Sequence, residues 1–194
     1  VCSSDLPVYR RSDIISALMP DQHVIAVAGT HGKTTTTAMI VHILQQAGHE
    51  PSYIVGGTMS NNGTNAGVGA GDAFVIEADE YGHMFLGLQP DTAVVTNIEW
   101  DHPDYFTTAA DLERAFRDFI ALLPDDGLMV GYADDIIVQD LLAVRGSSGH
   151  PIASYATTYP AAQWRAADIR YESGFLMANV LHHNQPQGAL SLQI

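Results

Sequence analysis

The segment that decides the fold runs from His23 to Thr36 and reads His-Val-Ile-Ala-Val-Ala-Gly-Thr-His-Gly-Lys-Thr-Thr-Thr. Its first six residues form a continuous apolar run, which is typical of a strand buried on both faces of a parallel sheet. A glycine-rich turn follows at once, and a helical pattern then extends from about Thr34 to Ala47, where Gly48 ends it. The segment therefore predicts a strand, a tight turn and a helix, in that order.

The same alternation of strands and helices continues along the chain. Short apolar runs predict further strands at 53–55, 73–76, 92–96, 128–132 and 152–155. Helical patterns predict helices at 12–19, 109–123 and about 134–144, and residues 56–72 predict a long loop. This order predicts an α/β fold of the phosphate-binding-loop type, with a doubly wound, mainly parallel sheet and helices on both faces.

The pattern changes after Pro160. Residues 163–171, 174–182 and 189–194 alternate polar and apolar side chains and are joined by short polar turns. Such alternation is typical of antiparallel strands with one exposed face. We therefore expect a small antiparallel β-sheet at the C-terminal end, added to one side of the α/β core.

Composition and net charge exclude several classes of protein. The 194 residues, 46% hydrophobic and 15% charged, suit one globular domain and exclude disorder. The net charge of −14 has the wrong sign for binding nucleic acid or an anionic membrane, and no segment has the length of a membrane span or the pattern of a signal peptide. A single cysteine, Cys2, excludes an internal disulfide and favours a cytoplasmic location.

The turn from Gly29 to Thr35 has the residues of a phosphate-binding loop. Glycines let backbone N–H groups point inward, Thr34 supplies a hydroxyl for Mg²⁺, and a helix N-terminus follows. Lys33 is the only lysine of the chain, and it stands where such a loop needs its ammonium. The match is to a shortened variant, because Val27 occupies a position where the strict pattern has glycine. The alternative is a glycine turn with a solvated lysine.

Polar clusters follow two of the expected strands, at the edge where α/β sheets bind ligands. One is Glu77-Ala-Asp-Glu80, and the other runs from Asn97 to Asp104 and contains His102. Carboxylate oxygens suit Mg²⁺, so Glu77 and His102 are candidate metal ligands. For Asp79, Glu80 and Glu99, a role in the site and a role as a solvated loop residue remain equally open.

Three motifs together resemble the central ATP-binding domain of the Mur ligases: Gly29-Thr-His-Gly-Lys-Thr-Thr-Thr36, Glu77-Ala-Asp-Glu80 and Thr96-Asn-Ile-Glu-Trp-Asp-His102. The resemblance runs from about Pro7 to the end of the chain. Within the family, the loop histidine and the acidic run are most similar to the branch that joins L-alanine to UDP-N-acetylmuramate. The murein tripeptide ligases share both features. Folylpolyglutamate synthases are less similar, since Gly-Ser follows their loop lysine.

The resemblance implies a reaction and a set of cofactors. In the family, a substrate carboxylate attacks the γ-phosphate of ATP, and an amino-acid amine then attacks the acyl phosphate, in peptidoglycan synthesis. Two Mg²⁺ ions are implied, with Mn²⁺ as a substitute. The partners are therefore small molecules: the nucleotide, a UDP-sugar and an amino acid.

The resemblance also implies roles for individual residues. Lys33 and the loop residues would hold the phosphates, Thr34 and Glu77 would bind the first Mg²⁺, and Glu77 and His102 the second. Asn97 matches a position near the nucleotide. The full set of implied nucleotide-binding residues is Gly29, Thr30, His31, Gly32, Lys33, Thr34, Thr35 and Asn97.

Family enzymes have three domains, so the resemblance predicts a division of the chain. Residues 1–20 are expected to be the tail of an N-terminal UDP-sugar domain, and residues 21–194 a C-terminally truncated central domain. Two alternatives stay open. A small P-loop kinase or NTPase would require an arginine-rich lid, yet residues 81–96 contain no lysine or arginine. The other alternative is a module that binds nucleotide without chemistry of its own.

Overall fold

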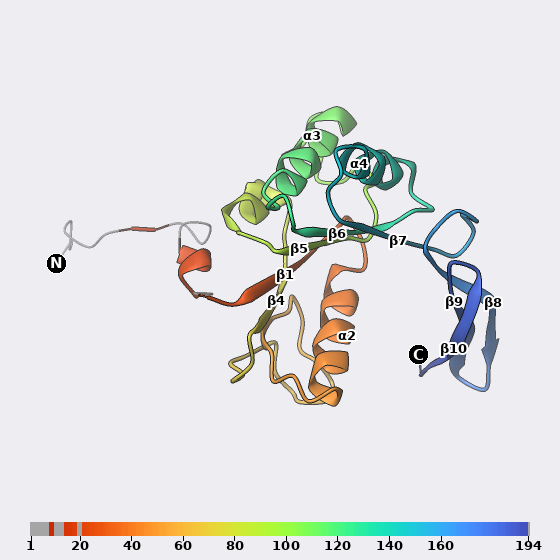
Figure 1. Cartoon of the computed structure of the whole chain (residues 1–194). Helices are drawn as coiled ribbons and strands as arrows, with labels where there is room; N and C mark the ends of the chain where they lie inside the picture. The colour runs from red at the N-terminus through yellow and green to blue at the C-terminus, as the bar shows by residue number, and fades with distance from the viewer. Residues whose placement is uncertain (1–7, 10–13, 19–20, 194) are drawn as a thin grey trace.

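The computed structural model describes residues 8–9, 14–18 and 21–193, and it shows a ten-stranded sheet with helices on both faces (Figure 1). The strands are β1 (His23–Ala28), β2 (Ser52–Ile54), β3 (Ala66–Gly67), β4 (Ala73–Glu77), β5 (Thr92–Val95), β6 (Leu128–Tyr132), β7 (Ile152–Ala156), β8 (Trp164–Glu172), β9 (Phe175–His182) and β10 (Gln185–Gln193). The helices are α2 (Lys33–Gln46), α3 (Ala109–Ile120) and α4 (Ile136–Ser147), with 3₁₀ helices η1 (Ile15–Leu18) and η2 (Tyr81–Gly87).

The order of the strands confirms the doubly wound arrangement. It reads β10-β9-β8-β7-β6-β5-β1-β4-β2-β3, and the run from β2 to β8 is parallel throughout. The chain moves from β1 out to β2, returns to β4, and then crosses to β5 on the other side of β1. Such a reversal creates a crevice at the carboxyl ends of the strands, where open α/β sheets bind ligands.

Strand β1 is apolar from Val24 to Ala28 because both of its faces are covered there. Val24, Ala26 and Ala28 belong to the larger hydrophobic cluster, which also contains the buried side chains of α3 and α4. Ile25 packs against the smaller cluster, which includes Val41 of α2. Successive residues of a strand point to opposite faces, so a strand between two helical layers needs apolar residues at every position. Figure 1 shows α3 and α4 on one face of the sheet and α2 on the other.

Several elements differ from the sequence-based expectation. Helix α3 ends at Ile120 rather than Leu123, because the N–H groups of Leu122 and Leu123 bond to carbonyls only three residues back. The expected loop 56–72 contains the short strand β3, which pairs antiparallel with β2. The described part of the helix expected at 12–19 is η1, and its expected N-cap Ser12 lies outside the described residues.

Strands β8, β9 and β10 are antiparallel to one another, as expected, but they are continuous with the main sheet. Tyr155 and Ala156 of β7 pair in parallel register with Trp164 and Arg165 of β8. Figure 1 shows the three strands projecting from the β7 end of the sheet. Strand β10 begins at Gln185, earlier than expected, and tolerates Pro186 because it lies at the sheet edge. Among the described residues, no helix has the length and apolar character needed to cross a membrane.

Asp134 joins these strands to the core. Its carboxylate accepts hydrogen bonds from the backbone N–H groups of Thr157, Thr158 and Tyr159 and from both threonine hydroxyls. Partial burial alone would raise the pKa of Asp134, but the hydrogen bonds from Thr157 and Thr158 outweigh it and lower the pKa well below its ordinary range. The turn between β7 and β8 therefore depends on one ionised carboxylate.

Asp134→Ala should lower the free energy of unfolding by about 1–2 kcal/mol at pH 7, a value discounted for the partial exposure of the carboxylate. Folding lowers the pKa of Asp134. Its contribution to the free energy of unfolding is therefore complete at pH values above its pKa in the unfolded chain, about 4, and is lost as the pH falls further. Urea denaturation at pH 7 and pH 3 should therefore show a smaller difference from wild type at pH 3. The exposed Asp126→Ala is the control, with an expected change within about 0.5 kcal/mol. Equal losses at both pH values would contradict this account.

Candidate functional site

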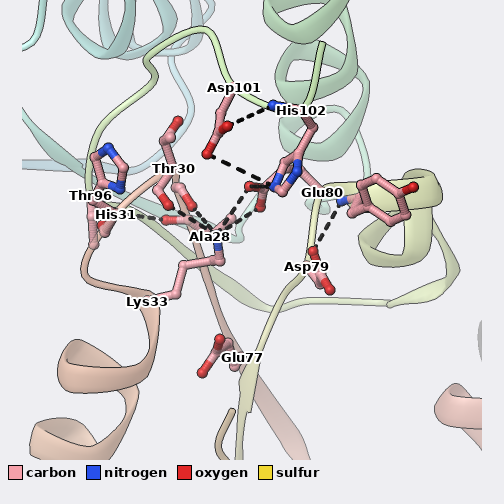
Figure 2. Close-up of polar contacts among 12 residues, drawn as sticks. Ala28, Thr30, His31, Lys33, Glu77, Asp79, Glu80, Thr96, Asp101 and His102 are labelled. Carbon is pink, nitrogen blue, oxygen red and sulfur yellow. Dashed lines mark hydrogen bonds and ion pairs between the residues drawn. The ribbon is translucent and has the colours of Figure 1, made fainter. Parts of the chain in front are cut away.

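The predicted site residues lie at the carboxyl ends of β1, β4 and β5, which are neighbours in the middle of the sheet (Figure 2). The turn that contains Gly29 and Lys33 follows β1, Glu77 ends β4, and the loop that contains Asn97 and His102 follows β5. Parallel strands bring these three chain segments to one edge, although about 70 positions separate the first from the last. The sequence-based expectation of one shared edge is thus confirmed.

Two glycines shape the turn after β1. Gly29 has φ 141°, and a Cβ atom there would lie 1.9 Å from Oγ1 of Thr96. Gly32 has φ 80° and is the N-cap of α2, a left-handed conformation that glycine adopts at little cost. The turn therefore requires glycine at Gly29 for space as well as for conformation, and at Gly32 for conformation.

The N-terminus of α2 is open. Gly32 has no side chain, so no side-chain cap accepts hydrogen bonds from the first turn of the helix. The leading N–H groups of a helix lack partners within the helix, and together with the helix dipole they favour an anion. Lys33, Thr34 and Thr35 form this first turn, and the side chains of Thr34 and Thr35 are exposed. The arrangement suits a phosphate group.

Asn97 holds the turn in place from the β5 side. The N–H of Thr30 donates to the Asn97 carbonyl at 3.0 Å, and the N–H of His31 donates to its side-chain Oδ1 at 2.8 Å. The Thr30 hydroxyl and the backbone of Glu99 exchange two hydrogen bonds of 2.9 Å. The amides of Thr30 and His31 are therefore engaged within the protein, and the amides of the α2 first turn are the ones available to a ligand.

Lys33 does not extend into solvent. Its ammonium donates to the carbonyls of Gly29 at 2.6 Å and Thr30 at 3.2 Å, and to Oε1 of Glu80 at 3.0 Å. The Glu80 side chain is only 1% exposed, against 14% for that of Lys33. Sequence reasoning left Glu80 open, and the structure places it in the middle of the site. The residue types alone gave no signal for this, because the alternating burial of Ala78 and Glu80 past β4 is visible only in the structure.

Glu77 and Thr34 form a second polar group beside the turn. The Thr34 hydroxyl donates to Oε1 of Glu77 at 3.1 Å, and the N–H of Gly56 donates to Oε2 at 2.7 Å. A Cβ atom on Gly56 would lie 2.5 Å from this carboxylate, so the loop after β2 needs glycine there. A hydroxyl and a carboxylate that meet beside a helix N-terminus are the donor types that Mg²⁺ prefers.

His102 faces Glu80 from the loop after β5. Its Nε2 lies 3.7 Å from Oε1 of Glu80, and its backbone has φ 53°, which is uncommon for a residue with a side chain. Its N–H donates to Oδ1 of Asp101 at 2.7 Å, and its ring packs edge-on against Tyr81. Tyr81 in turn donates to Asp104, and this hydrogen bond to a carboxylate raises the pKa of Tyr81.

The structure thus separates the expected ligands into two groups. Thr34 and Glu77 form one group, while Lys33, Glu80 and His102 form the other, and Figure 2 shows Glu77 lying apart from the second group. Within the described ranges, no three His, Cys, Asp or Glu side chains converge so as to hold a metal ion by themselves. Any cation here therefore needs further ligands from a substrate such as a phosphate chain.

Comparisons with known proteins identify the family. The model of the Mur ligase middle domain matches residues 27–194. The UDP-N-acetylmuramate–L-alanine ligase of Frankia alni is 40% identical over 99% of this chain, and that of Renibacterium salmoninarum is 46% identical over 84%. The solved ligase of Neisseria meningitides that joins UDP-N-acetylmuramate to L-alanyl-γ-D-glutamyl-meso-diaminopimelate has a TM-score of 0.80 and 28% identity, over 94% of this chain and 59% of its own.

The chain spans only 34% and 35% of the lengths of the two curated relatives. The match nevertheless includes the turn after β1 and both polar loops, which lie within residues 27–194. The resemblance drawn from the three sequence motifs is confirmed: the chain belongs to the Mur ligase family and carries its middle domain.

Proposed function

We propose that residues 21–194 are the central nucleotide-binding domain of a longer, ATP-dependent ligase. This ligase joins L-alanine to the carboxylate of UDP-N-acetylmuramate in peptidoglycan synthesis, in the cytoplasm. Residues 1–20 would then be the tail of an N-terminal UDP-sugar domain, and a C-terminal domain would hold the amino acid. The names of the relatives at 40% and 46% identity support the reaction. One observation carries the nucleotide site: the uncapped N-terminus of α2 beside the Lys33 ammonium.

The site supplies positive potential where a triphosphate needs it. The first-turn amides of α2 point outward, and Lys33 is the only lysine in a chain of net charge −14. With so few cationic side chains, divalent cations must offset much of the phosphate charge. Thr34 and Glu77 fit this requirement and would hold one Mg²⁺. Glu77 and His102 would hold a second, and because the two side chains lie in separate groups, that ion would need further ligands from the phosphates. When bound, these ions neutralise phosphate charge and bring an anionic carboxylate to the γ-phosphate.

The proposed ligase reaction proceeds in two steps. A carboxylate oxygen of UDP-N-acetylmuramate attacks the γ-phosphorus of ATP and ADP leaves, which forms an acyl phosphate. The amine of L-alanine then attacks the acyl carbon, inorganic phosphate leaves and the amine loses a proton. In the first step Lys33 and the α2 amides orient the phosphates, and the glycine turn keeps them close to the sheet edge.

A second candidate acts on a different amine substrate. The solved Neisseria ligase at TM-score 0.80 takes a tripeptide, L-alanyl-γ-D-glutamyl-meso-diaminopimelate, in place of an amino acid. Its similarity to this chain favours a murein tripeptide ligase as the alternative. The two candidates share the ATP and UDP-sugar chemistry and differ only in the amine.

The full-length protein should release ADP from ATP only when UDP-N-acetylmuramate and L-alanine are both present. A coupled ADP assay measures turnover, and mass spectrometry identifies the amide product. Turnover with the tripeptide in place of L-alanine would establish the second candidate. ADP release without either amine would instead support a kinase or NTPase, and ATP binding without any turnover would support a nucleotide-binding module.

Lys33→Met should weaken ATP binding by about two orders of magnitude, because it removes the only ammonium and keeps the length of the side chain. Isothermal titration calorimetry on the chain gives the dissociation constant. Arg114→Met is the matched control, since this exposed cation lies on α3 away from the site. Unchanged ATP affinity in Lys33→Met would remove the phosphate-binding role of the turn.

His102→Ala and Glu77→Gln should each lower kcat by about 100-fold in the full-length protein, with a smaller loss of ATP affinity than Lys33→Met causes. If both residues hold the same cation, the double variant should be far less impaired than the product of the two single effects. Steady-state kinetics and titration calorimetry measure both quantities. His49→Ala, an exposed histidine at the opposite end of α2, is the control. Strictly multiplicative losses would exclude a shared cation.

A further inference from the structure

Glu80 is the most deeply buried charged group of the site, with 1% of its side chain exposed. None of the roles proposed above uses it. Both of its oxygens lie 3.0 Å from the Lys33 ammonium, and Oε1 also lies 3.7 Å from Nε2 of His102. Figure 2 shows it between these two side chains. One carboxylate therefore contacts a residue of the β1 turn and a residue of the β5 loop.

The ammonium of Lys33 has a complete set of partners inside the protein. An ammonium carries three N–H donors, and Gly29, Thr30 and Glu80 provide three acceptors. The two carbonyls belong to the turn itself, so they move with Lys33. Glu80 is the partner that comes from another part of the chain, the segment between β4 and η2. It therefore fixes the ammonium relative to the rest of the sheet edge.

The ion pair between Lys33 and Glu80 is not expected to contribute much to the stability of the fold. Oε2 of Glu80 is buried and forms no hydrogen bond of good geometry, despite its closeness to Lys33. Removing two charges from water is costly, and the cost is recovered only when the buried oxygens are well hydrogen-bonded. A buried carboxylate paired with a lysine in this way is therefore weak evidence for a role in stability alone.

We propose that Glu80 is a positioning residue, which holds the Lys33 ammonium and the His102 imidazole at a fixed separation before the nucleotide arrives. The inference rests on the nucleotide-binding function proposed above, and it goes beyond that function by assigning a role to a buried residue that does not reach the ligand. Because Glu80 acts through Lys33 and His102, its loss should disturb the alignment of the phosphoryl group more than the binding of ATP.

The lone lysine permits a direct test in the 194-residue chain. Lysine labelled with ¹³C at Cε and ¹⁵N at Nζ gives a single set of NMR signals, which belongs to Lys33. In the nucleotide-free wild type, relaxation should report a rigid side chain. In Glu80→Gln, which keeps the size of the side chain and removes its charge, the same signals should report a mobile one. Asp79→Asn is the matched control, because it removes a neighbouring carboxylate whose hydrogen bond, among the described residues, comes from the N–H of Tyr81.

Kinetic measurements on the full-length protein test how the loss of Glu80 affects turnover and ATP binding. Glu80→Gln should lower kcat by at least about tenfold and change the dissociation constant of ATP, measured without Mg²⁺, by less than about threefold. Asp79→Asn should change neither quantity by more than about twofold. Glu80→Asp should not restore kcat, because the shorter side chain cannot reach both partners.

Each result bears on the inference. A rigid Lys33 in Glu80→Gln, an unchanged kcat, or a loss of ATP affinity as large as the loss of kcat would overturn it. Failure of the wild-type chain to bind ATP would refute the nucleotide-binding function instead. In that case the NMR comparison would still show whether Glu80 holds Lys33. Glutamine has nearly the same size as glutamate and leaves no cavity, so the variant is expected to fold, and its far-UV circular dichroism should match that of wild type.

Discussion

The contact between Gly29 and Thr96 is the constraint on which the site depends. The two residues follow neighbouring strands, β1 and β5, and the backbone of Gly29 lies so close to the Thr96 hydroxyl that no Cβ atom fits between them. That approach allows the hydroxyl to donate to the His31 carbonyl and lets Asn97 bond to the amides of Thr30 and His31. The turn is thereby held by the neighbouring loop as well as by its own glycines.

Fixing the turn in this way has an electrostatic consequence. With the amides of Thr30 and His31 engaged by Asn97, the unpaired donors of the first turn of α2 are concentrated beside Lys33 and Thr34. The chain as a whole repels anions because its net charge is −14. A local site built from backbone amides does not depend on that net charge, since oriented N–H groups act over short distances. The proposed phosphate affinity is therefore compatible with an acidic surface.

The sequence predicted the parts of this arrangement that periodicity and strand order determine. An apolar run such as 23–28 needs cover on both faces, so the strand and its two helical layers followed from residue types alone. The shared edge of Glu77, Asn97 and His102 followed because parallel strands end on the same side. The pairing of individual side chains could not be predicted, because it depends on distances between segments that are far apart in the chain.

Glu80 and Asn97 are examples of residues whose contacts could not be predicted from the sequence. Nothing in Glu77-Ala-Asp-Glu80 indicates which carboxylate turns outward to Thr34 and which turns inward to Lys33, since the backbone leaves β4 at Glu77 and its direction then depends on η2. The resemblance placed Asn97 near the nucleotide, which stays a prediction, and it gave no indication that Asn97 also holds the turn by hydrogen bonds. The continuity of β8 with β7 was missed for a similar reason, because only two residue pairs join these strands.

The site is also connected to the far side of the sheet through adjacent acidic residues. Asp135 caps α4 by accepting from Ile137 and Val138, and its second oxygen accepts from the N–H of Ile98, directly after Asn97. Its neighbour Asp134 holds the turn that leads into β8. The loop that positions the glycine turn after β1 and the turn that leads into β8 are therefore fixed by consecutive side chains. The loop after β5 and the turn between β7 and β8 both depend on a rigid β6–α4 connection. A substitution of Asp135 would therefore alter the site through the backbone of Ile98, without any contact to a ligand.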